Sequence, residues 1–179
     1  MANSPVGPTP RPLQLAILTV SDTRTLETDT SGQRLVEFAE RAGHEIMERR
    51  IVSDDVETIR EQVAQWAETS SIEVVLITGG TGITGRDVTP EAVEPLLGKT
   101  IPGFGELFRM LSYEDIGAAT IQSRAFAGLV GTTLVFALPG SGGAVGLAVD
   151  RILLPQLDVR TKPCNFAQLL DRLTEPPRH

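Results

Sequence analysis

Two glycine-rich segments each follow an apolar run and could bind a phosphate group through their backbone. The first is Gly79-Gly80-Thr81-Gly82, which continues to Gly85, and the second is Pro139-Gly140-Ser141 followed by Gly142-Gly143. A glycine loop that leads from a strand into a helix can direct backbone N–H groups at an anion. For the first segment, an ordinary tight turn is the alternative. Two such loops at one edge of a sheet would suit a ligand with two phosphate-bearing parts.

Two aspartates stand beside these segments and could hold a metal ion. Asp87 follows the first glycine segment, and Mg²⁺ prefers one or two carboxylates together with phosphate oxygens. The alternative for Asp87 is a turn closed by an Asx hydrogen bond. Asp54 precedes an expected helix with Glu57 three residues later, which is typical of an N-cap. Asp54 also follows an expected strand, so it can serve both purposes.

Two segments resemble motifs of nucleotide-binding proteins, but the residues around them do not match those motifs. Gly80-x-Gly82-x-x-Gly85 has the letters of a dinucleotide-binding fingerprint, but it follows the third expected strand and its helix starts several residues late. Gly98-Lys99-Thr100 lacks the glycine that a P-loop needs five residues before Gly98, because Val93 stands there. A plain nicotinamide, flavin or P-loop site is therefore not expected.

Composition excludes further classes of function. No apolar run approaches the ~20 residues of a membrane-spanning helix. Sixteen basic and twenty-three acidic residues give a net charge of −7, which argues against binding of DNA or RNA. The two histidines are too few for a metal cluster. A single cysteine, Cys164, rules out an intrachain disulfide and fits a reducing compartment. We therefore expect a cytoplasmic protein without membrane or nucleic-acid partners.

The elements that must position these residues alternate between strand-like and helix-like patterns. Apolar or alternating runs predict strands over 13–20, 45–52, 73–78 and 132–138. Helical spacing predicts helices over 30–42, from 56, and over 103–111, 144–154 and 166–173. Thr89-Pro90-Glu91 predicts a further helix, with Thr89 as its cap and the proline in its first turn. Such alternation favours a mostly parallel sheet with helices on both faces. Ligands of such sheets bind at the carboxyl ends of the strands, where loops 21–29, 79–89 and 139–143 would meet.

The length of 179 residues fits one domain with a substantial core. Residues 1–12 contain four prolines and no apolar stretch, which predicts a flexible amino-terminal tail and not a signal peptide. Residues 13–175 are expected to form the single domain.

Four motifs, two of which contain the glycine segments, occur in a fixed order along the chain. They are Thr78–Gly82 followed by Arg86–Ala92, then Pro102–Glu106, Ser123–Ala125 and Leu138–Ser141. In this order they resemble the signature of the MoaB/Mog family of molybdenum cofactor biosynthesis proteins. The resemblance runs from about residue 13 to residue 166. Ser21-Asp22-Thr23-Arg24 and the ending Pro163-Cys164-Asn165-Phe166 are similar to the MoaB branch.

The resemblance implies a three-layer α/β/α sandwich of the molybdopterin-binding type with a mixed, mostly parallel sheet. It implies a homo-oligomer, a trimer or a hexamer of two trimers, and other molybdenum cofactor biosynthesis proteins as candidate partners. Catalytic members of the family adenylylate molybdopterin with MgATP and release pyrophosphate. A member that binds molybdopterin without catalysis is the alternative, and an unrelated nucleotide-binding or redox protein is a third possibility.

The family's functional residues match positions of this chain. Asp54 and Asp87 match the two catalytic acids, which the resemblance implies as the holders of Mg²⁺. The positions implied for substrate binding are Ser21, Asp22, Gly79, Gly80, Thr81, Gly82, Glu106, Ser123, Arg124, Pro139, Gly140 and Ser141. One departure is Gly146, which follows Gly142-Gly143 and stands where the family often has a basic side chain. A weaker grip on one phosphate is expected from it.

Overall fold

A six-stranded sheet forms the centre of the protein in a computed structural model that describes residues 9–175. The strand order is β2-β1-β3-β6-β5-β4, and β5 alone runs antiparallel to its neighbours. The strands are β1 Gln14–Val20, β2 Glu45–Val52, β3 Val74–Thr78, β4 Lys99–Thr100, β5 Phe126–Val130 and β6 Thr133–Leu138. The prediction of a mixed, mostly parallel sheet is confirmed.

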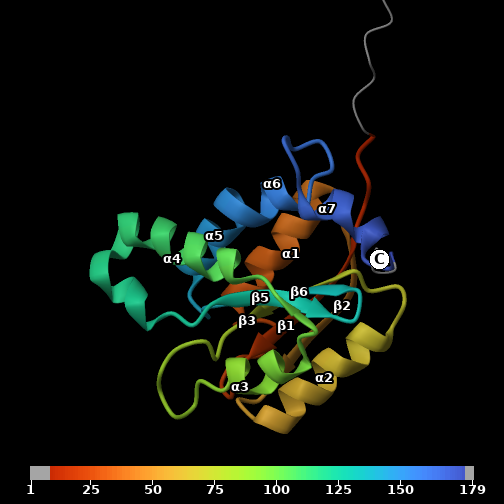
Figure 1. Ribbon diagram of the computed structural model, residues 1–179. Coiled ribbons are helices and arrows are strands. Elements are labelled where there is room, and N and C mark those ends of the chain that lie inside the picture. Colours follow the sequence, from red (N-terminus) through yellow and green to blue (C-terminus); the bar gives the residue numbers. More distant parts are fainter. Residues whose placement is uncertain (1–8, 176–179) are drawn as a thin grey trace, which may run out of the picture.

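Helices cover both faces of this sheet and complete three layers (Figure 1). One face carries α1 Thr30–Ala42, α4 Pro102–Ile116, α5 Gly142–Ala148, α6 Leu154–Gln156 and α7 Phe166–Leu169. The other carries α2 Val56–Glu68 and α3 Thr89–Val93. Shorter helical segments are η1 Glu94–Leu96, η2 Gly117–Gln122, η3 Val149–Leu153 and η4 Leu170–Arg172. Each face buries its own apolar cluster, as the predicted α/β/α sandwich requires.

Local sequence explains where α1 begins and ends. The Asp29 carboxylate caps its first turn by accepting a hydrogen bond from Gly32 N at 2.8 Å. Gly43 ends it in the left-handed region, at φ 77°, which glycine adopts without strain. Leu35, Phe38 and Ala39 form the buried stripe between them. The expected helix over 30–42 is confirmed.

The pair β4–β5 is not predicted by the sequence pattern. Gly128 stands in the middle of β5, where glycine weakens the pattern of a strand. A Cβ at this position would lie 2.6 Å from the carbonyl oxygen of Lys99 in β4, so the close approach of the two strands requires glycine. β4 itself is only two residues long, too short to form a recognisable pattern.

Most other expected boundaries lie within a few residues of the observed ones. The helix expected over 103–111 continues to Ile116, and Gly117 follows it. The one expected over 144–154 begins at Gly142 and passes through the π-helical segment η3 into α6. The expected last helix is divided between α7 and η4.

The two ends of the chain lie partly outside the described residues. Of the predicted tail, residues 1–8 are not described, and Arg11 forms an ion pair with Glu73 next to β3. The division into a tail and one domain over 13–175 stays a prediction. No helix within residues 9–175 combines the length and the apolar character that a membrane crossing requires.

The strand order places a ligand site at the edge where β1, β3 and β6 end. β1 pairs with β2 on one side and with β3 on the other, so the connections from β1 and β2 lead in opposite directions across the sheet. The loops after β1 and β3 separate at this point and leave a crevice between them. The predicted ligand loops therefore converge on one edge of the sheet.

Candidate functional site

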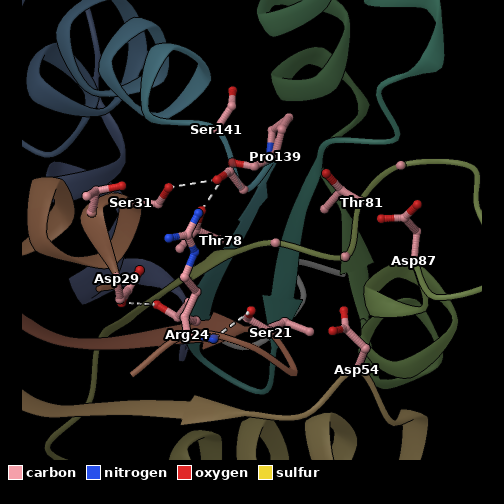
Figure 2. Close-up of a pocket in the computed structure, with 17 residues that line it drawn as sticks. Ser21, Arg24, Asp29, Ser31, Asp54, Thr78, Thr81, Asp87, Pro139 and Ser141 are labelled. Atoms are coloured by element: carbon pink, nitrogen blue, oxygen red, sulfur yellow. Dashed lines mark hydrogen bonds between the residues drawn. The ribbon is translucent and has the colours of Figure 1, made fainter. Parts of the chain in front are cut away.

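A cavity of about 430 Å³ opens at the carboxyl ends of β1, β3 and β6 (Figure 2). The lining residues are 19–21, 24 and 29–31, then 78–82 and 139–141, together with Asp54 and Asp87. Ten of the residues implied for the site line this cavity: Ser21, Asp54, Gly79, Gly80, Thr81, Gly82, Asp87, Pro139, Gly140 and Ser141. The remaining four, Asp22, Glu106, Ser123 and Arg124, do not line it.

The first glycine loop has a backbone that only glycine accommodates easily. Gly79 and Gly80 have φ angles of 107° and 62°. A Cβ on Gly79 would lie 2.2 Å from the carbonyl oxygen of Val20, and one on Gly80 would lie 2.4 Å from the Thr89 hydroxyl. The loop therefore packs directly on the end of β1, with its backbone facing the cavity.

Thr89 locks this loop and does not cap α3. Its hydroxyl donates to the carbonyl oxygen of Gly79 at 2.9 Å, and its N–H donates to that of Gly80 at 2.9 Å. The residue at the N-cap of α3 is Val88, which has no capping side chain. The expectation that Thr89 caps the helix is wrong, because its hydroxyl is used to hold the glycine loop. The expected proline in the first turn is present.

The second loop is held by hydroxyl groups from two other elements. Ser31 of α1 donates to the carbonyl oxygen of Gly140 at 2.8 Å, and Thr78 of β3 donates to that of Pro139 at 3.1 Å. Ser141 Oγ accepts from Ala144 N at 3.2 Å and caps α5. Both glycine loops are thus fixed before any ligand arrives, which lowers the cost of ordering them on binding.

Asp54 faces the cavity because its neighbour takes the capping position. Asp55 is the N-cap of α2 and accepts a hydrogen bond from Thr58 N at 2.8 Å. The capping interpretation of Asp54 is therefore wrong. The Asp54 carboxylate accepts from Asp22 N at 3.1 Å, and its second oxygen is not used by any hydrogen bond within residues 9–175. It is available to a ligand or a metal ion.

Asp87 both closes a turn and lines the cavity. One carboxylate oxygen, Oδ2, accepts from the Thr84 N–H at 2.8 Å and from the Thr84 hydroxyl at 2.7 Å. Asp87 therefore closes a turn as expected, but through Thr84, three residues before it, and not through a following residue as in an Asx turn. The two roles coexist because the carboxylate has a second oxygen, and Figure 2 shows Asp87 and Asp54 on the same side of the cavity.

The pKa values of the two carboxyl groups are shifted in opposite directions. Burial raises the pKa of Asp54, and the nearby negative charge of Asp87 raises it further. Burial alone would also raise the pKa of Asp87, but the hydrogen bonds from Thr84 and the positive charge of Arg124 outweigh it and lower that pKa. Asp87 is consequently the more firmly ionised of the pair. A nearby cation would stabilise the ionised form of Asp54, which burial and Asp87 disfavour.

A cation at this pair would depend on its ligand for further oxygen atoms. Among the described residues no group of three or more His, Cys, Asp or Glu side chains could hold a metal ion. Each of the two carboxylates has one oxygen atom without a hydrogen bond from residues 9–175. Such a pair suits Mg²⁺, which is commonly held by one or two carboxylates and by substrate phosphates. The donor set of the cavity therefore fits a cation that arrives with a phosphate.

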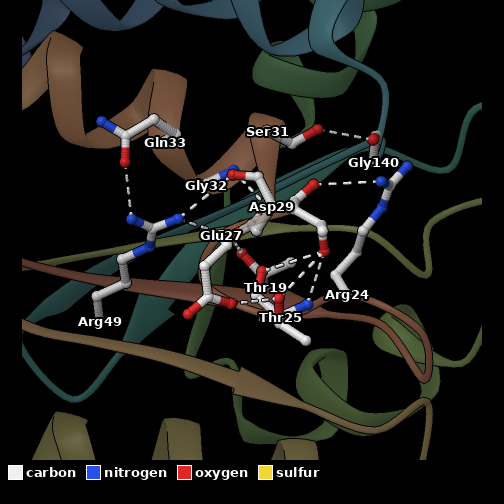
Figure 3. A network of polar contacts seen from close by, with 11 residues as sticks. Thr19, Arg24, Thr25, Glu27, Asp29, Ser31, Gly32, Gln33, Arg49 and Gly140 are labelled. Carbon is white, nitrogen blue, oxygen red and sulfur yellow. Dashed lines mark hydrogen bonds and ion pairs between the residues drawn. The ribbon is translucent and has the colours of Figure 1, made fainter.

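Arg24, Asp29 and Ser31 also line the cavity, although none of them is among the positions implied for the site. The buried Asp29 carboxylate is fully used, because it accepts from Thr19 Oγ1 at 2.7 Å and pairs with Arg49 at 3.1 Å, besides capping α1 (Figure 3). It therefore supports the site and leaves no charge for a ligand. For Arg24 and Asp29, the signal in the sequence was their position in loop 21–29 at the expected ligand edge.

Arg124 secures the first glycine loop from behind. Its guanidinium donates to the carbonyl oxygens of Gly82 at 2.6 Å and Asp87 at 2.7 Å, and pairs with Glu91. Its backbone N–H donates to the Thr81 carbonyl oxygen at 2.9 Å. Every polar contact of Arg124 thus goes to the loop or to Glu91 of α3, and it positions the loop from outside the cavity.

The other implied residues lie around the cavity in different ways. Glu106 lines a second cavity of about 680 Å³ between α3, α4 and β5, beside Arg124. Ser123 accepts from Arg109 through its carbonyl oxygen at 3.4 Å. Asp22 forms an ion pair with Arg86 and accepts from Asp54 N at 3.1 Å, so it joins the loops around the cavity.

Arg34 occupies the space beside the glycines that depart from the family pattern. Its guanidinium donates to the carbonyl oxygen of Gly142 at 2.9 Å. A Cβ on Gly146 would lie 3.0 Å from its Nη1. A positive charge from α1 therefore stands next to the first turns of α5, although the helix itself carries none there.

The sequence is similar to a family described as "Probable molybdopterin binding domain" over residues 16–159. It is 52% identical over 155 residues to molybdenum cofactor biosynthesis protein B of Escherichia coli (strain K12), which covers 87% of this chain and 91% of that protein. The protein of the same name from Bacillus subtilis (strain 168) is 51% identical over 142 residues, covering 79% of this chain and 84% of that protein.

Solved structures show the same likeness. A crystal structure of molybdenum cofactor biosynthesis protein B superposes with a TM-score of 0.85 at 46% identity, covering 94% of this chain and 100% of that one. The tungsten cofactor synthesizing protein MoaB from Pyrococcus furiosus superposes with a TM-score of 0.72 at 37% identity, covering 81% and 92%. The similarity thus extends over the sheet, both helical layers and the loops of the cavity.

Proposed function

The chain belongs to the MoaB branch of the MoaB/Mog family and has a role in molybdenum cofactor biosynthesis, and on this premise we propose that it binds molybdopterin and adenylylates it with MgATP. The products are adenylyl-molybdopterin and pyrophosphate. The observation that carries the proposal is the presence of Asp54 and Asp87 on one side of a cavity that two glycine loops border.

In the proposed reaction, an oxygen of the terminal phosphate of molybdopterin attacks the α-phosphorus of ATP. The bond from the α-phosphorus to the oxygen that bridges to the β-phosphate breaks, and pyrophosphate leaves with that oxygen. Both reactants are anions and repel each other, so holding them in line is the main task of the protein. The backbone N–H groups of Gly80–Gly82 and Gly140–Ser141 would supply donors for this purpose, whereas that of Gly79 already donates to Leu138.

The two acids would hold the magnesium ion that accompanies ATP. Mg²⁺ bound there would neutralise phosphate charge and orient the phosphate oxygens. Asp87 suits a fixed ligand because it is anchored to Thr84 and firmly ionised. Asp54 suits a second ligand because burial and, after it, the charge of Asp87 raise its pKa, and a cation between the two carboxylates would relieve their repulsion.

The test is to mix purified protein with molybdopterin and MgATP and to measure adenylyl-molybdopterin and pyrophosphate. We expect both products in equal amounts. Binding of molybdopterin without either product would assign the chain the non-catalytic, pterin-binding role and would overturn the proposed transfer. The Asp87→Asn variant is the control for contaminating enzymes, since it should lower both products together.

We further propose a homo-oligomer, a trimer or a hexamer, located in the cytoplasm where ATP is supplied. An exposed apolar face on α4 and η2 supports the assembly. It comprises Leu107, Met110, Tyr113, Ile116 and Ile121, of which Met110 is 62% and Ile121 82% exposed. Contiguous exposed apolar side chains are typical of an interaction surface. Other molybdenum cofactor biosynthesis proteins are the remaining candidate partners.

A further inference from the structure

Arg24 is the only basic side chain among the described residues that line the site cavity. Its guanidinium donates to the carbonyl oxygen of Thr28 at 3.2 Å and forms no ion pair within residues 9–175. Three nearby arginines are all paired, Arg49 with Asp29, Arg86 with Asp22 and Arg124 with Glu91. The cavity therefore contains one positive charge that no carboxylate of this region neutralises.

This charge lies at the opposite end of the cavity from the two acids. Figure 2 shows the Arg24 guanidinium near Ser31, and Asp54 and Asp87 on the other side of the cavity. Figure 3 also shows Arg24 close to Gly140 and Ser31. The cavity thus has an acidic end, formed by Asp54 and Asp87 near the first glycine loop, and a basic end, formed by Arg24 near the second.

Two hydroxyl groups of the cavity have unused hydrogen-bonding capacity. Ser141 Oγ accepts from Ala144 N, and its O–H has no acceptor among residues 9–175. Thr81 is 1% exposed, and its Oγ1 is buried without any partner in the described part of the chain. A buried hydroxyl without a partner is costly, so a cavity that leaves one unpaired is suited to a ligand that supplies the missing bond.

We propose that the Arg24 end of the cavity binds a phosphate monoester that carries no metal ion, and that the Asp54–Asp87 end takes the phosphates that arrive with Mg²⁺. The inference rests on the proposed function and deepens it, because it assigns the molybdopterin phosphate to Arg24 and Ser141. Two carboxylates repel a bare phosphate, whereas a guanidinium matches its geometry with two parallel donors. Arg24 is thereby the residue that decides which anion occupies which end.

The experiment measures binding of inorganic phosphate in EDTA and of MgATP separately, by calorimetry on the full chain. Arg24→Gln should weaken binding of metal-free phosphate at least about 10-fold, as expected for loss of a charged hydrogen bond. It should change MgATP binding by less than about 3-fold, since that ligand is held by the other end. Arg24→Lys should fall between, because lysine keeps the charge but loses the paired donors.

The control is Arg41→Gln, which removes the same charge from an exposed residue of α1 outside the cavity and should bind both ligands like the wild type. The inference is overturned if Arg24→Gln binds metal-free phosphate like wild type, or if it loses MgATP in preference to phosphate. These results leave the proposed function in place if adenylyl transfer is observed. Conversely, absence of transfer together with phosphate loss in Arg24→Gln rejects the transfer and supports the subsite.

Discussion

Asp22 and Asp54 bind each other's backbone. The Asp54 carboxylate accepts from Asp22 N, and the Asp22 carboxylate accepts from Asp54 N, each at 3.1 Å. This reciprocal pair joins the loop after β1 to the loop after β2 and turns the Asp54 carboxylate toward the cavity. Because Asp22 also pairs with Arg86, three loops of the site are held through one side chain.

The neighbours Asp54 and Asp55 offer a matched test of function against capping. Asp54→Asn should nearly abolish adenylyl transfer and leave the melting temperature unchanged or slightly higher, because it removes a carboxylate whose ionisation the fold disfavours. Asp55→Ala should lower the melting temperature by removing the cap of α2, with transfer retained. Calorimetry and a transfer assay on both variants check this. Full activity of Asp54→Asn would exclude a catalytic role for Asp54.

Asp87→Asn should separate metal-dependent chemistry from pterin binding. The amide oxygen can still accept from Thr84, so the turn should persist, but the charge that holds Mg²⁺ is lost. We expect a loss of at least ~10²-fold in transfer rate, equivalent to about 2.7 kcal/mol of barrier. Molybdopterin affinity without Mg²⁺ should be largely kept. Loss of that affinity together with a lower melting temperature would show that Asp87 is structural.

The same variant should change the titration of Asp54. Removing the negative charge of Asp87 takes away one of the two causes that raise the pKa of Asp54, so this pKa should fall toward its ordinary value. Burial still acts, so the return should be incomplete. Carbon NMR of the Asp54 carboxyl group in metal-free protein measures both pKa values. An unchanged pKa in Asp87→Asn would show that the two carboxylates do not interact.

The raised pKa of Asp54 also has a consequence for stability with a definite sign. The folded chain holds the Asp54 proton more tightly than the unfolded chain, so its contribution to the free energy of unfolding is fully present below the unfolded pKa. It is lost as pH rises through the folded pKa. In metal-free protein, the free energy of unfolding of Asp54→Asn should therefore fall less than that of the wild type as pH rises through this range. Denaturant titrations at several pH values would detect the difference. An identical pH dependence in both proteins would contradict the raised pKa.

Arg124 should act as a positioning residue for Asp87 and the first glycine loop. Arg124→Lys keeps the positive charge but cannot reach the carbonyl oxygens of both Gly82 and Asp87 and pair with Glu91 as well. We expect a transfer rate lower by about 10-fold, because the loop is held less firmly, and faster hydrogen exchange over residues 82–87. The pKa of Asp87 should stay low in Arg124→Lys and rise in Arg124→Gln, which loses the charge. Full activity of Arg124→Lys would show that only the positive charge of Arg124 is needed, and not its hydrogen bonds to the loop.

The apolar face of α4 and η2 should mediate self-association. Light scattering at micromolar concentration should give the mass of three or six chains of 19.2 kDa. Met110→Glu combined with Ile116→Glu should yield monomers, because two charges cannot be buried between copies without partners. Met47→Glu, at a half-exposed position of β2, is the control and should leave the assembly intact. A single 19 kDa species of the wild type would refute the oligomer.

Periodicity and local signals in the sequence determined most of the elements and where the ligand loops meet. α1 is one example, because its capping aspartate, apolar stripe and final glycine lie within a few residues of each other. The two glycine loops are another, since the carboxyl ends of parallel strands meet at one edge whatever their order. Asp87 could be placed beside the first loop for the same reason.

The tertiary structure alone decided which side chains face the cavity. The local sequence predicted Asp54 as the cap of α2, but in the structure Asp55 caps the helix and Asp54 bonds with Asp22, 32 residues away. Arg24 and Arg124 both stand in recognisable motifs, yet one lines the cavity and the other secures the loop from behind. The direction of a long, flexible side chain depends on carbonyl and carboxylate groups that only folding brings near it, and no local pattern in the sequence encodes those neighbours.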